Sequence, residues 1–170
     1  MQERKDLVTM KGNPVTLVGN EVQVGQAAPD FTAVANDLSP VNLNSFKGKK
    51  LIISAVPSLD TGICDIETKR FNQEAAKLPD VQIITISMDL PFAQKRWCAG
   101  ANVNNVKTIS DYRERAFGGA YGVLIKELGL LARAIFVVDS SGKIQNIQLV
   151  KEITTEPDYN SVLEAVKKIK

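Results

Sequence analysis

The sequence predicts an α/β protein with a mixed central β-sheet flanked by helices and an N-terminal β-hairpin. Two continuous apolar runs, LIISAV at 51–56 and VQIITIS at 81–87, have the β-branched composition of strands that are covered on both faces. A segment with helical periodicity follows each run. Two further apolar segments, at 132–139 and 143–150, are separated by the turn residues SSG, which is a hairpin pattern.

Length and composition predict a single domain. The chain has 170 residues, of which 44% are hydrophobic and 24% are charged, and this suits one globular domain spanning residues 1–170. Lys plus Arg number 21 against 19 for Asp plus Glu, without a long run of one sign. This charge pattern argues against binding to nucleic acid or to an anionic membrane surface.

The N-terminus, MQERKDLVTM, lacks the apolar core of a signal peptide, and LIISAV is too short to span a bilayer. We therefore expect a cytoplasmic protein. In a reducing compartment most thiols stay free, and a disulfide there is usually transient and catalytic. The chain has two cysteines, Cys64 and Cys98, whose spacing matches neither a Cys-x-x-Cys motif nor a zinc site.

The N-terminal third reads as β-structure. PVTLV and EVQV flank Gly19-Asn20, a pattern that predicts a hairpin with its turn at these two residues. DFTAVAND at 30–37 predicts a strand that ends before Ser39-Pro40. LIISAV is then expected to be a central strand, because its apolar residues do not alternate with polar ones.

An amphipathic helix is expected after Pro57, with Thr61 as its N-cap and with Leu78-Pro79 at its end. Its apolar positions recur at helical spacing and place Cys64 on the inward face. These positions are Cys64, Thr68, Phe71, Ala75 and Leu78.

Later segments complete the topology. A second buried strand at 81–89 is followed by a helix over about 91–99, which carries Cys98 near its C-terminal end. The hairpin around SSG precedes a final helix, for which Thr155 is a plausible N-cap. The order is a hairpin region, β-α-β, a helical stretch, β-β and α, which indicates a thioredoxin-like topology.

The position of Cys64 suggests a reactive thiol. If Thr61 is the N-cap, Cys64 lies in the first helical turn, where free N–H groups and the helix dipole favour the thiolate. The Thr61 hydroxyl can cap the helix or bond to the sulfur or to a substrate oxygen. Pro57 cannot continue the strand and fixes the loop below the helix start. The absence of histidine excludes a cysteine hydrolase with a His base and a His-containing zinc site.

Each of these features also has a purely structural explanation. A free cysteine is among the most often buried residues, so Cys64 or Cys98 could simply fill the core. Thr61 could be only a helix cap. An arginine in an apolar stretch, such as Arg133 in LLARAIF, is usually a surface or edge residue whose charge reaches water.

The combination is more specific than its parts. Pro57, Thr61 and Cys64 form a P-x-x-x-T-x-x-C pattern that resembles the active-site motif of the peroxiredoxins. The surroundings are similar to the thiol peroxidase branch of that family, from GNPVTLVG at residue 12 onward. The similar segments are PSLDTGICD, ETKRFN, SMDLPFAQKRWC, SDYRERAFG, LLARAIFVVD and EITTEPDY.

The resemblance implies a thioredoxin-like fold of the peroxiredoxin type and an atypical two-cysteine peroxidase acting on hydrogen peroxide and organic hydroperoxides. Cys64 would be the peroxidatic cysteine and Cys98 the resolving cysteine, and the two would form an intramolecular disulfide. Thr61 and Arg133 would bind the peroxide and hold the thiolate, and Pro57 would shield the pocket. It also implies thioredoxin as reductant, a homodimer, and no metal or cofactor.

Both thiols fall in predicted helices, whereas a disulfide needs the two Cα atoms within about 7 Å. We therefore expect local unfolding around both cysteines during turnover. Two other functions stay open at this point. One is a redox-sensing module that forms the same disulfide without multiple turnover, and the other is a structural domain with inert thiols.

Overall fold

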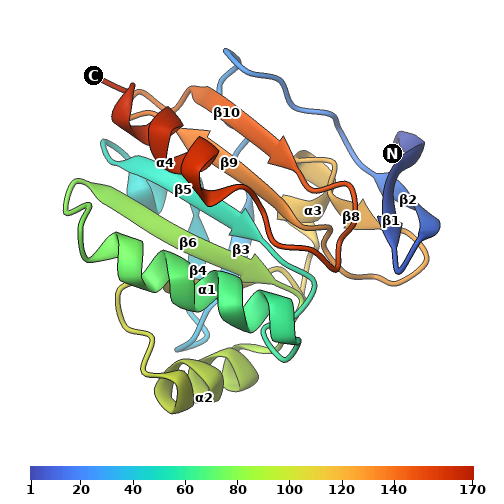
Figure 1. Cartoon of the computed structure of the whole chain (residues 1–170), viewed down its shortest axis with the longest axis horizontal. Helices are drawn as coiled ribbons and strands as arrows, with labels where there is room; N and C mark the ends of the chain where they lie inside the picture. Colours follow the sequence, from blue (N-terminus) through green and yellow to red (C-terminus); the bar gives the residue numbers. More distant parts are fainter.

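The computed structural model describes all 170 residues as a mixed α/β fold with a seven-stranded and a three-stranded sheet (Figure 1). The large sheet has the order β10-β9-β5-β6-β7-β3-β4. Its strands are β3 (Thr32–Ala35), β4 (Pro40–Asn42), β5 (Lys50–Ala55), β6 (Val81–Ser87), β7 (Lys107–Ser110), β9 (Ala134–Val138) and β10 (Ile144–Leu149). The sheet is therefore mixed, as the sequence predicts.

Strand β5 lies in the interior of this sheet. It pairs in parallel with β6 and antiparallel with β9, and β6 pairs in parallel with β7. Ile52 and Ile53 are both fully buried but belong to different apolar clusters, one on each face of the sheet. This burial on both faces explains why LIISAV shows no polar alternation.

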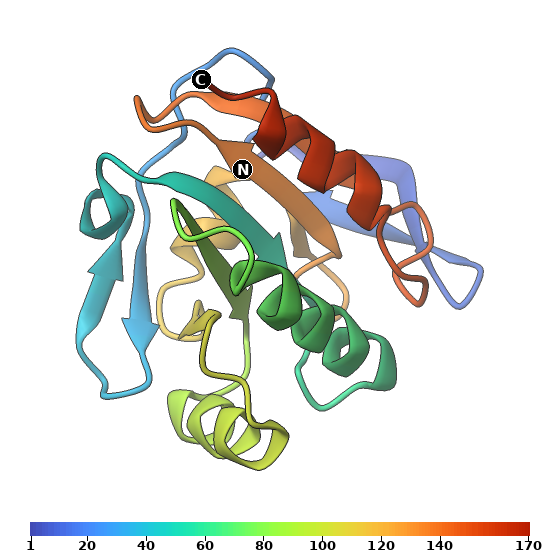
Figure 2. The same ribbon diagram turned by 60° about the vertical axis from the view of Figure 1, so that its left-hand side comes forward.

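Helices cover both faces of the sheet. Helices α1 (Gly62–Ala75) and α4 (Tyr159–Lys167) lie side by side on one face, as the two views in Figures 1 and 2 show. Helix α2 (Pro91–Ala101) packs beside β7, and the short helix α3 (Ala116–Ala120) lies on the opposite face, near the N-terminal strands. A 3-10 helix, η1 (Leu43–Phe46), connects β4 to β5.

The N-terminal hairpin is present, but its strands differ from the predicted ones. It consists of β1 (Glu3–Met10) and β2 (Asn13–Val18), and β2 also pairs with β8 (Leu124–Ile125). The turn lies at Lys11-Gly12, both with positive φ (51° and 78°), as in a type I′ hairpin turn. The prediction of a turn at Gly19-Asn20 with EVQV as the second strand is wrong.

Gly19 instead serves a close approach between two backbones. A Cβ atom at this position would lie 2.3 Å from the carbonyl oxygen of Gly119, and the Asn20 N–H donates to that oxygen at 2.8 Å. A glycine is therefore needed at position 19 because two chain segments pass close to each other there, and not because the chain turns.

Three further details differ from the sequence prediction. Helix α2 continues through Gly100 and ends at Ala101, and its C-cap Asn102 has a left-handed φ of 54°. Helix α4 has Asp158 rather than Thr155 as its N-cap, since the Asp158 side chain accepts from the Ser161 N–H. The short strand β7 lies within the segment between α2 and β9, where no strand was predicted.

Asp111 anchors the start of α3 from the end of β7. Its carboxylate accepts hydrogen bonds from the backbone N–H groups of Phe117 (3.0 Å) and Gly118 (2.8 Å). The side chain is almost completely buried, and this burial raises the pKa of Asp111 to about 6, although the N–H donors partly oppose the shift.

Glu152 fastens the N-terminal hairpin to the loop that follows β10. Its carboxylate accepts from the Thr154 and Thr9 hydroxyls and from the Gly12 N–H at 3.0 Å. These hydrogen bonds lower the pKa of Glu152 to about 2, and the bond from Thr154 has the largest effect. In addition, Thr9 accepts a backbone bond from Ile153 at 2.9 Å.

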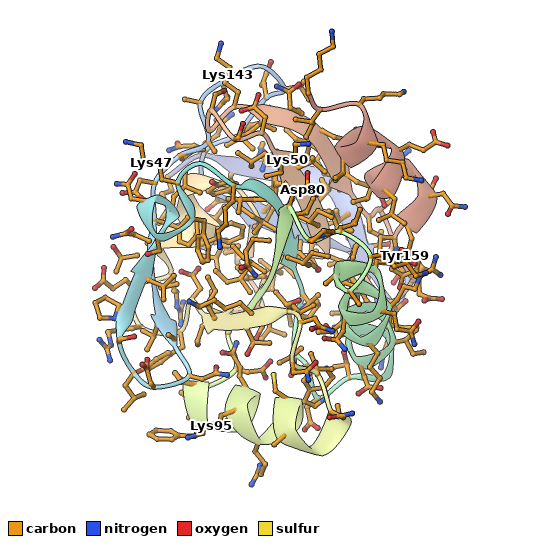
Figure 3. The ribbon with its side chains drawn as sticks, turned by 90° about the vertical axis from the view of Figure 1, so that its left-hand side faces the viewer. Lys47, Lys50, Asp80, Lys95, Lys143 and Tyr159 are labelled. Atoms are coloured by element: carbon orange, nitrogen blue, oxygen red, sulfur yellow. The ribbon has the colours of Figure 1, made fainter.

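One end of the sheet carries a surface ion pair, and the other end carries the loop that leads to Cys64. Lys50 and Asp80 form an ion pair of 3.2 Å at the end where β5 and β6 begin (Figure 3). The loop between β5 and α1, with Cys64 just beyond it, lies at the other end. None of the helices is both long enough and apolar enough to cross a membrane.

Candidate active site

Cys64 lies in the first turn of α1, at the end of the sheet where β5 stops. Thr61 is the N-cap residue, as predicted, with extended backbone angles, and its carbonyl accepts from the Asp65 N–H at 2.9 Å. Cys64 is fully buried in a small cluster with Val56 and Leu59. The strand-to-helix connection thus places the sulfur beside the unpaired N–H groups of a helix start.

The Thr61 side chain does not cap the helix. Its hydroxyl donates to the backbone carbonyl of Ser58 at 2.9 Å, and no hydrogen bond joins it to Cys64. Thr61 is exposed, whereas Pro57, four residues before it in the same loop, is buried. The hydroxyl oxygen retains lone pairs that can accept a hydrogen bond from a ligand.

The pairing register of β5 and β9 places Arg133 beside Cys64. Ala134, the first residue of β9, pairs with Ala55, the last residue of β5, so Arg133 lies next to the start of the loop that leads to Cys64. Its Nη2 donates to Cys64 Sγ at 3.3 Å. Arg133 is only 2% exposed, so the explanation of this residue as a surface or edge arginine is wrong.

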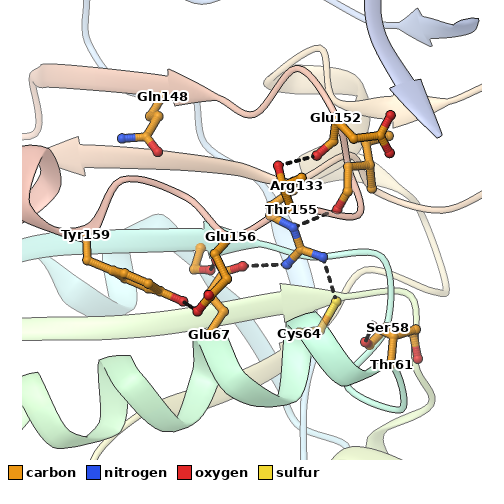
Figure 4. A network of polar contacts seen from close by, with 12 residues as sticks. Ser58, Thr61, Cys64, Glu67, Arg133, Gln148, Glu152, Thr155, Glu156 and Tyr159 are labelled. Atoms are coloured by element: carbon orange, nitrogen blue, oxygen red, sulfur yellow. Dashed lines mark hydrogen bonds and ion pairs between the residues drawn. The ribbon is translucent and has the colours of Figure 1, made fainter. Parts of the chain in front are cut away.

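Two further groups hold the guanidinium (Figure 4). Arg133 Nε donates to the Ile153 carbonyl at 2.9 Å, and Nη1 forms an ion pair with Glu67, which is fully buried. Glu67 Oε1 also accepts from the Ser54 hydroxyl at 2.7 Å. The guanidinium thus has a fixed orientation, with one N–H directed at the sulfur.

The electrostatics of this cluster keep a positive charge beside the sulfur. Desolvation lowers the pKa of Arg133, but Glu67 and Cys64 outweigh it, so that the pKa is raised and the side chain stays cationic. Burial raises the pKa of Glu67, and Arg133 and Ser54 oppose that shift. A sulfur anion at Cys64 would therefore face a cation that is shared with one carboxylate.

Glu67 is a residue of this site that the sequence patterns did not indicate. It lies three residues after Cys64, on the same inward face of α1. A charged residue at a buried helical position is the signal that could have revealed it, because such a charge needs a buried partner. Arg133 in its apolar stretch would have been the natural candidate.

Cys98 lies in the last two turns of α2. Cys64 and Cys98 are both free thiols, with no disulfide between them. The Cys98 Sγ is in hydrogen-bond contact with the Thr108 hydroxyl, at 3.4 Å. Burial raises the pKa of the Cys98 thiol, although Thr108 partly offsets this. This environment favours the protonated thiol.

Trp97 connects the two cysteine-bearing helices. It packs against the cluster that contains Cys64, and its Nε1 donates to Asp65 at 3.1 Å. The structure thus brings Cys64, Arg133 and Thr61 to one end of the sheet and places Cys98 on a neighbouring helix. No group of three or more Cys, Asp or Glu side chains is arranged to hold a metal ion.

Comparisons with known proteins show the family to which the chain belongs. The family model described as Redoxin matches residues 23–163. A thiol peroxidase of Halalkalibacterium halodurans is 56% identical over 160 residues, which are 94% of this chain and 96% of that protein. The chain belongs to the thiol peroxidase branch of the peroxiredoxin family.

A second relative and a solved structure give the same result. The thiol peroxidase of Bacillus subtilis is 55% identical over 94% of this chain and 96% of its own. Among solved structures, a peroxiredoxin-like protein from Aquifex aeolicus is 46% identical, with a TM-score of 0.90, over 96% of this chain and 98% of that one. The thioredoxin-like fold of the peroxiredoxin type is thereby confirmed.

Proposed function

We propose that this chain is a thiol-dependent peroxidase that reduces hydrogen peroxide and organic hydroperoxides, with Cys64 as the peroxidatic residue. The observation that supports this most directly is the buried guanidinium of Arg133, which donates to Cys64 Sγ at 3.3 Å. A cation and free helix N–H groups favour a thiolate and can stabilise negative charge that develops in the transition state. Membership of the thiol peroxidase branch supports the same chemistry.

The first step consumes the peroxide. The Cys64 thiolate attacks the terminal oxygen of ROOH, so that an S–O bond forms and the O–O bond breaks. The leaving alkoxide or hydroxide takes up a proton and departs as alcohol or water. Cys64 is oxidised to a sulfenic acid, and the peroxide is reduced by two electrons.

Arg133 and Thr61 have distinct parts in this step. Arg133 would hold the thiolate and then the attacked oxygen. The Thr61 hydroxyl donates to the Ser58 carbonyl, so its oxygen is free to accept the peroxide O–H and to orient the substrate. Pro57, a buried residue of this loop, would limit the access of water.

The second step forms a disulfide. The Cys98 thiol attacks the Cys64 sulfenic acid, an S–S bond forms, and water leaves. The two helices that carry the sulfurs are intact and joined through Trp97, so local unfolding of both is part of the proposal. An external dithiol, for which we propose thioredoxin, then reduces the disulfide and restores both thiols.

The remaining assignments are also proposals. Residues 1–170 would act as one domain, since the N-terminal hairpin shares an apolar cluster with the large sheet. The need for a dithiol reductant suits the cytoplasm. Leu90 and Phe92, 53% and 66% exposed at the start of α2, support a homodimer in which they are covered.

Mass spectrometry of the Cys98→Ser variant after one equivalent of peroxide tests the first step. We expect one oxygen atom added at Cys64, and the Cys64→Ser variant is the matched control that should add none. A Cys64 that stays unmodified would remove the proposal. Peroxide consumption coupled to thioredoxin over many turnovers separates an enzyme from a redox sensor, which would react only once.

A further inference from the structure

The carboxylate of Asp89 binds the loop that precedes Cys64. Asp89 Oδ1 accepts from the Ser58 hydroxyl at 2.6 Å, and Oδ2 accepts from the Leu59 N–H at 2.8 Å and from the Ser87 hydroxyl at 2.7 Å. Asp89 itself follows β6 and is half-buried. Two segments that are far apart in sequence are thus joined by one side chain.

Ser58 passes this constraint on to the start of α1. Its hydroxyl accepts from the Asp60 N–H at 3.1 Å, and its carbonyl accepts from both the N–H and the hydroxyl of Thr61. Thr61 is the N-cap of the helix in which Cys64 lies. The bonds to Asp89 therefore fix the conformation of the loop that presents the helix N–H groups to the sulfur.

Asp89 also stands at the start of the helix that carries Cys98. It directly precedes Leu90, the N-cap of α2, and its backbone carbonyl accepts from the Ser110 hydroxyl on β7. The bonds of Asp89 to Ser58 and Leu59 join the two cysteine-bearing segments at the start of α2. The hydrogen bond from Trp97 to Asp65 joins them again in the second half of α2. We infer that an approach of Cys98 to Cys64 disturbs these contacts.

We propose that Asp89 is a positioning residue that holds the Cys64 loop in the arrangement used for peroxide attack and opposes the unfolding needed for disulfide formation. This inference rests on the proposed peroxidase function. Asp89 then sets the balance between the two steps and hence the lifetime of the Cys64 sulfenic acid. A long lifetime permits a second hydroperoxide to oxidise the sulfenic acid to a sulfinic acid, with release of water or alcohol.

Removal of the carboxylate separates these effects. In Asp89→Ala the Leu59 N–H and the Ser58 hydroxyl lose their acceptor, so we expect peroxide attack to slow about tenfold, since hydrogen bonds to charged groups are worth about that factor or more. Disulfide formation is expected to accelerate, and sulfinic acid should accumulate only at higher peroxide concentrations. Asp89→Asn keeps one acceptor oxygen for Leu59 and is expected to be intermediate.

The single tryptophan makes the experiment direct, because Trp97 contacts the Cys64 cluster and neighbours Cys98 in sequence. Stopped-flow tryptophan fluorescence in a Cys98→Ser background measures attack alone, and the two-cysteine protein adds the resolving step. Asp80→Asn, at the opposite end of β6, is the matched charge control (Figure 3). Val41→Ala on the edge strand β4 is the control for a general loss of stability.

Opposite changes in the two rates, with partial rescue in Asp89→Asn and near-normal rates in both controls, would support the proposal. It would be overturned if both rates stayed unchanged, or if Asp89→Ala and Val41→Ala altered them alike. Should Asp89→Ala fail to fold, Ser58→Ala decides, since it deletes one of the same bonds and should change the rates in the same directions. If the unmutated chain consumed no peroxide, the proposed function would fail as well, which distinguishes the two results.

Discussion

Arg133→Lys is the substitution for which the structure makes the sharpest prediction. Arg133 donates from three nitrogens, to Ile153, Glu67 and Cys64, in one rigid fork. A lysine keeps the positive charge but has a single nitrogen, which cannot reach all three acceptors. Because Glu67 is the buried carboxylate, the ammonium is expected to stay with it and to leave the sulfur.

The loss of the contact to Cys64 affects the chemical step directly. A buried hydrogen bond to a charged group contributes about 1.5–3 kcal/mol. If this contribution is made in the transition state, its loss slows peroxide attack by roughly 10- to 100-fold. The unpaired Ile153 carbonyl should also lower the free energy of unfolding by about 1–3 kcal/mol.

Stopped-flow kinetics with hydrogen peroxide measure the second-order rate constant, and urea unfolding measures the stability. Arg70→Lys is the matched control, since Arg70 lies on the same helix as Cys64 but pairs with Glu74 in a half-exposed position. This control should react at the normal rate. An Arg133→Lys variant that attacked peroxide within threefold of the unmutated protein would refute the assigned part of the guanidinium fork.

Two further predictions concern pH and the N-terminal strands. Asp111 has a folded-state pKa of about 6, above its ordinary value, so its contribution to stability is present at low pH and lost as the pH rises through 6. The free energy of unfolding should therefore increase by about 1 kcal/mol between pH 7 and pH 5, relative to the same change in Asp111→Asn. Urea unfolding at the two pH values measures this difference. Glu152 has a lowered pKa of about 2, so its contribution is present above pH 4 and lost as the pH falls toward 2. Glu152→Gln should make the Gly12 amide exchange hydrogen faster at neutral pH, while the centre of β5 exchanges as before.

The central strands and the first helix were predictable because periodicity records burial directly. LIISAV is buried on both faces, and Cys64, Thr68 and Phe71 lie on the inward face of α1 as expected. The N-terminal hairpin was predicted as an element but with the wrong strands. Lys11-Gly12 provides the turn, and Gly19 is needed for a contact with Gly119, which only the tertiary structure reveals.

Cys64, Thr61 and Arg133 were identified from the motif and from the family resemblance, and the structure places them at one end of the sheet. The roles proposed for them stay predictions. Glu67 and Asp89 were not identified, because each acts through partners that are distant in sequence, Arg133 for one and Ser58 for the other. Such pairings follow from strand register and loop path, which no local pattern contains.

The bond between Thr9 and Ile153 has a practical consequence for handling the protein. Ile153 supplies the carbonyl that accepts from Arg133 Nε, and its own N–H donates to the Thr9 carbonyl on β1. Strand β1 thus helps to hold the guanidinium in place through Ile153. Removing strand β1 to attach a purification tag, or cleaving within residues 1–10, would weaken that support although no residue near Cys64 is altered. Preparations that differ only at this terminus should be compared by their reaction with peroxide before their yields are compared.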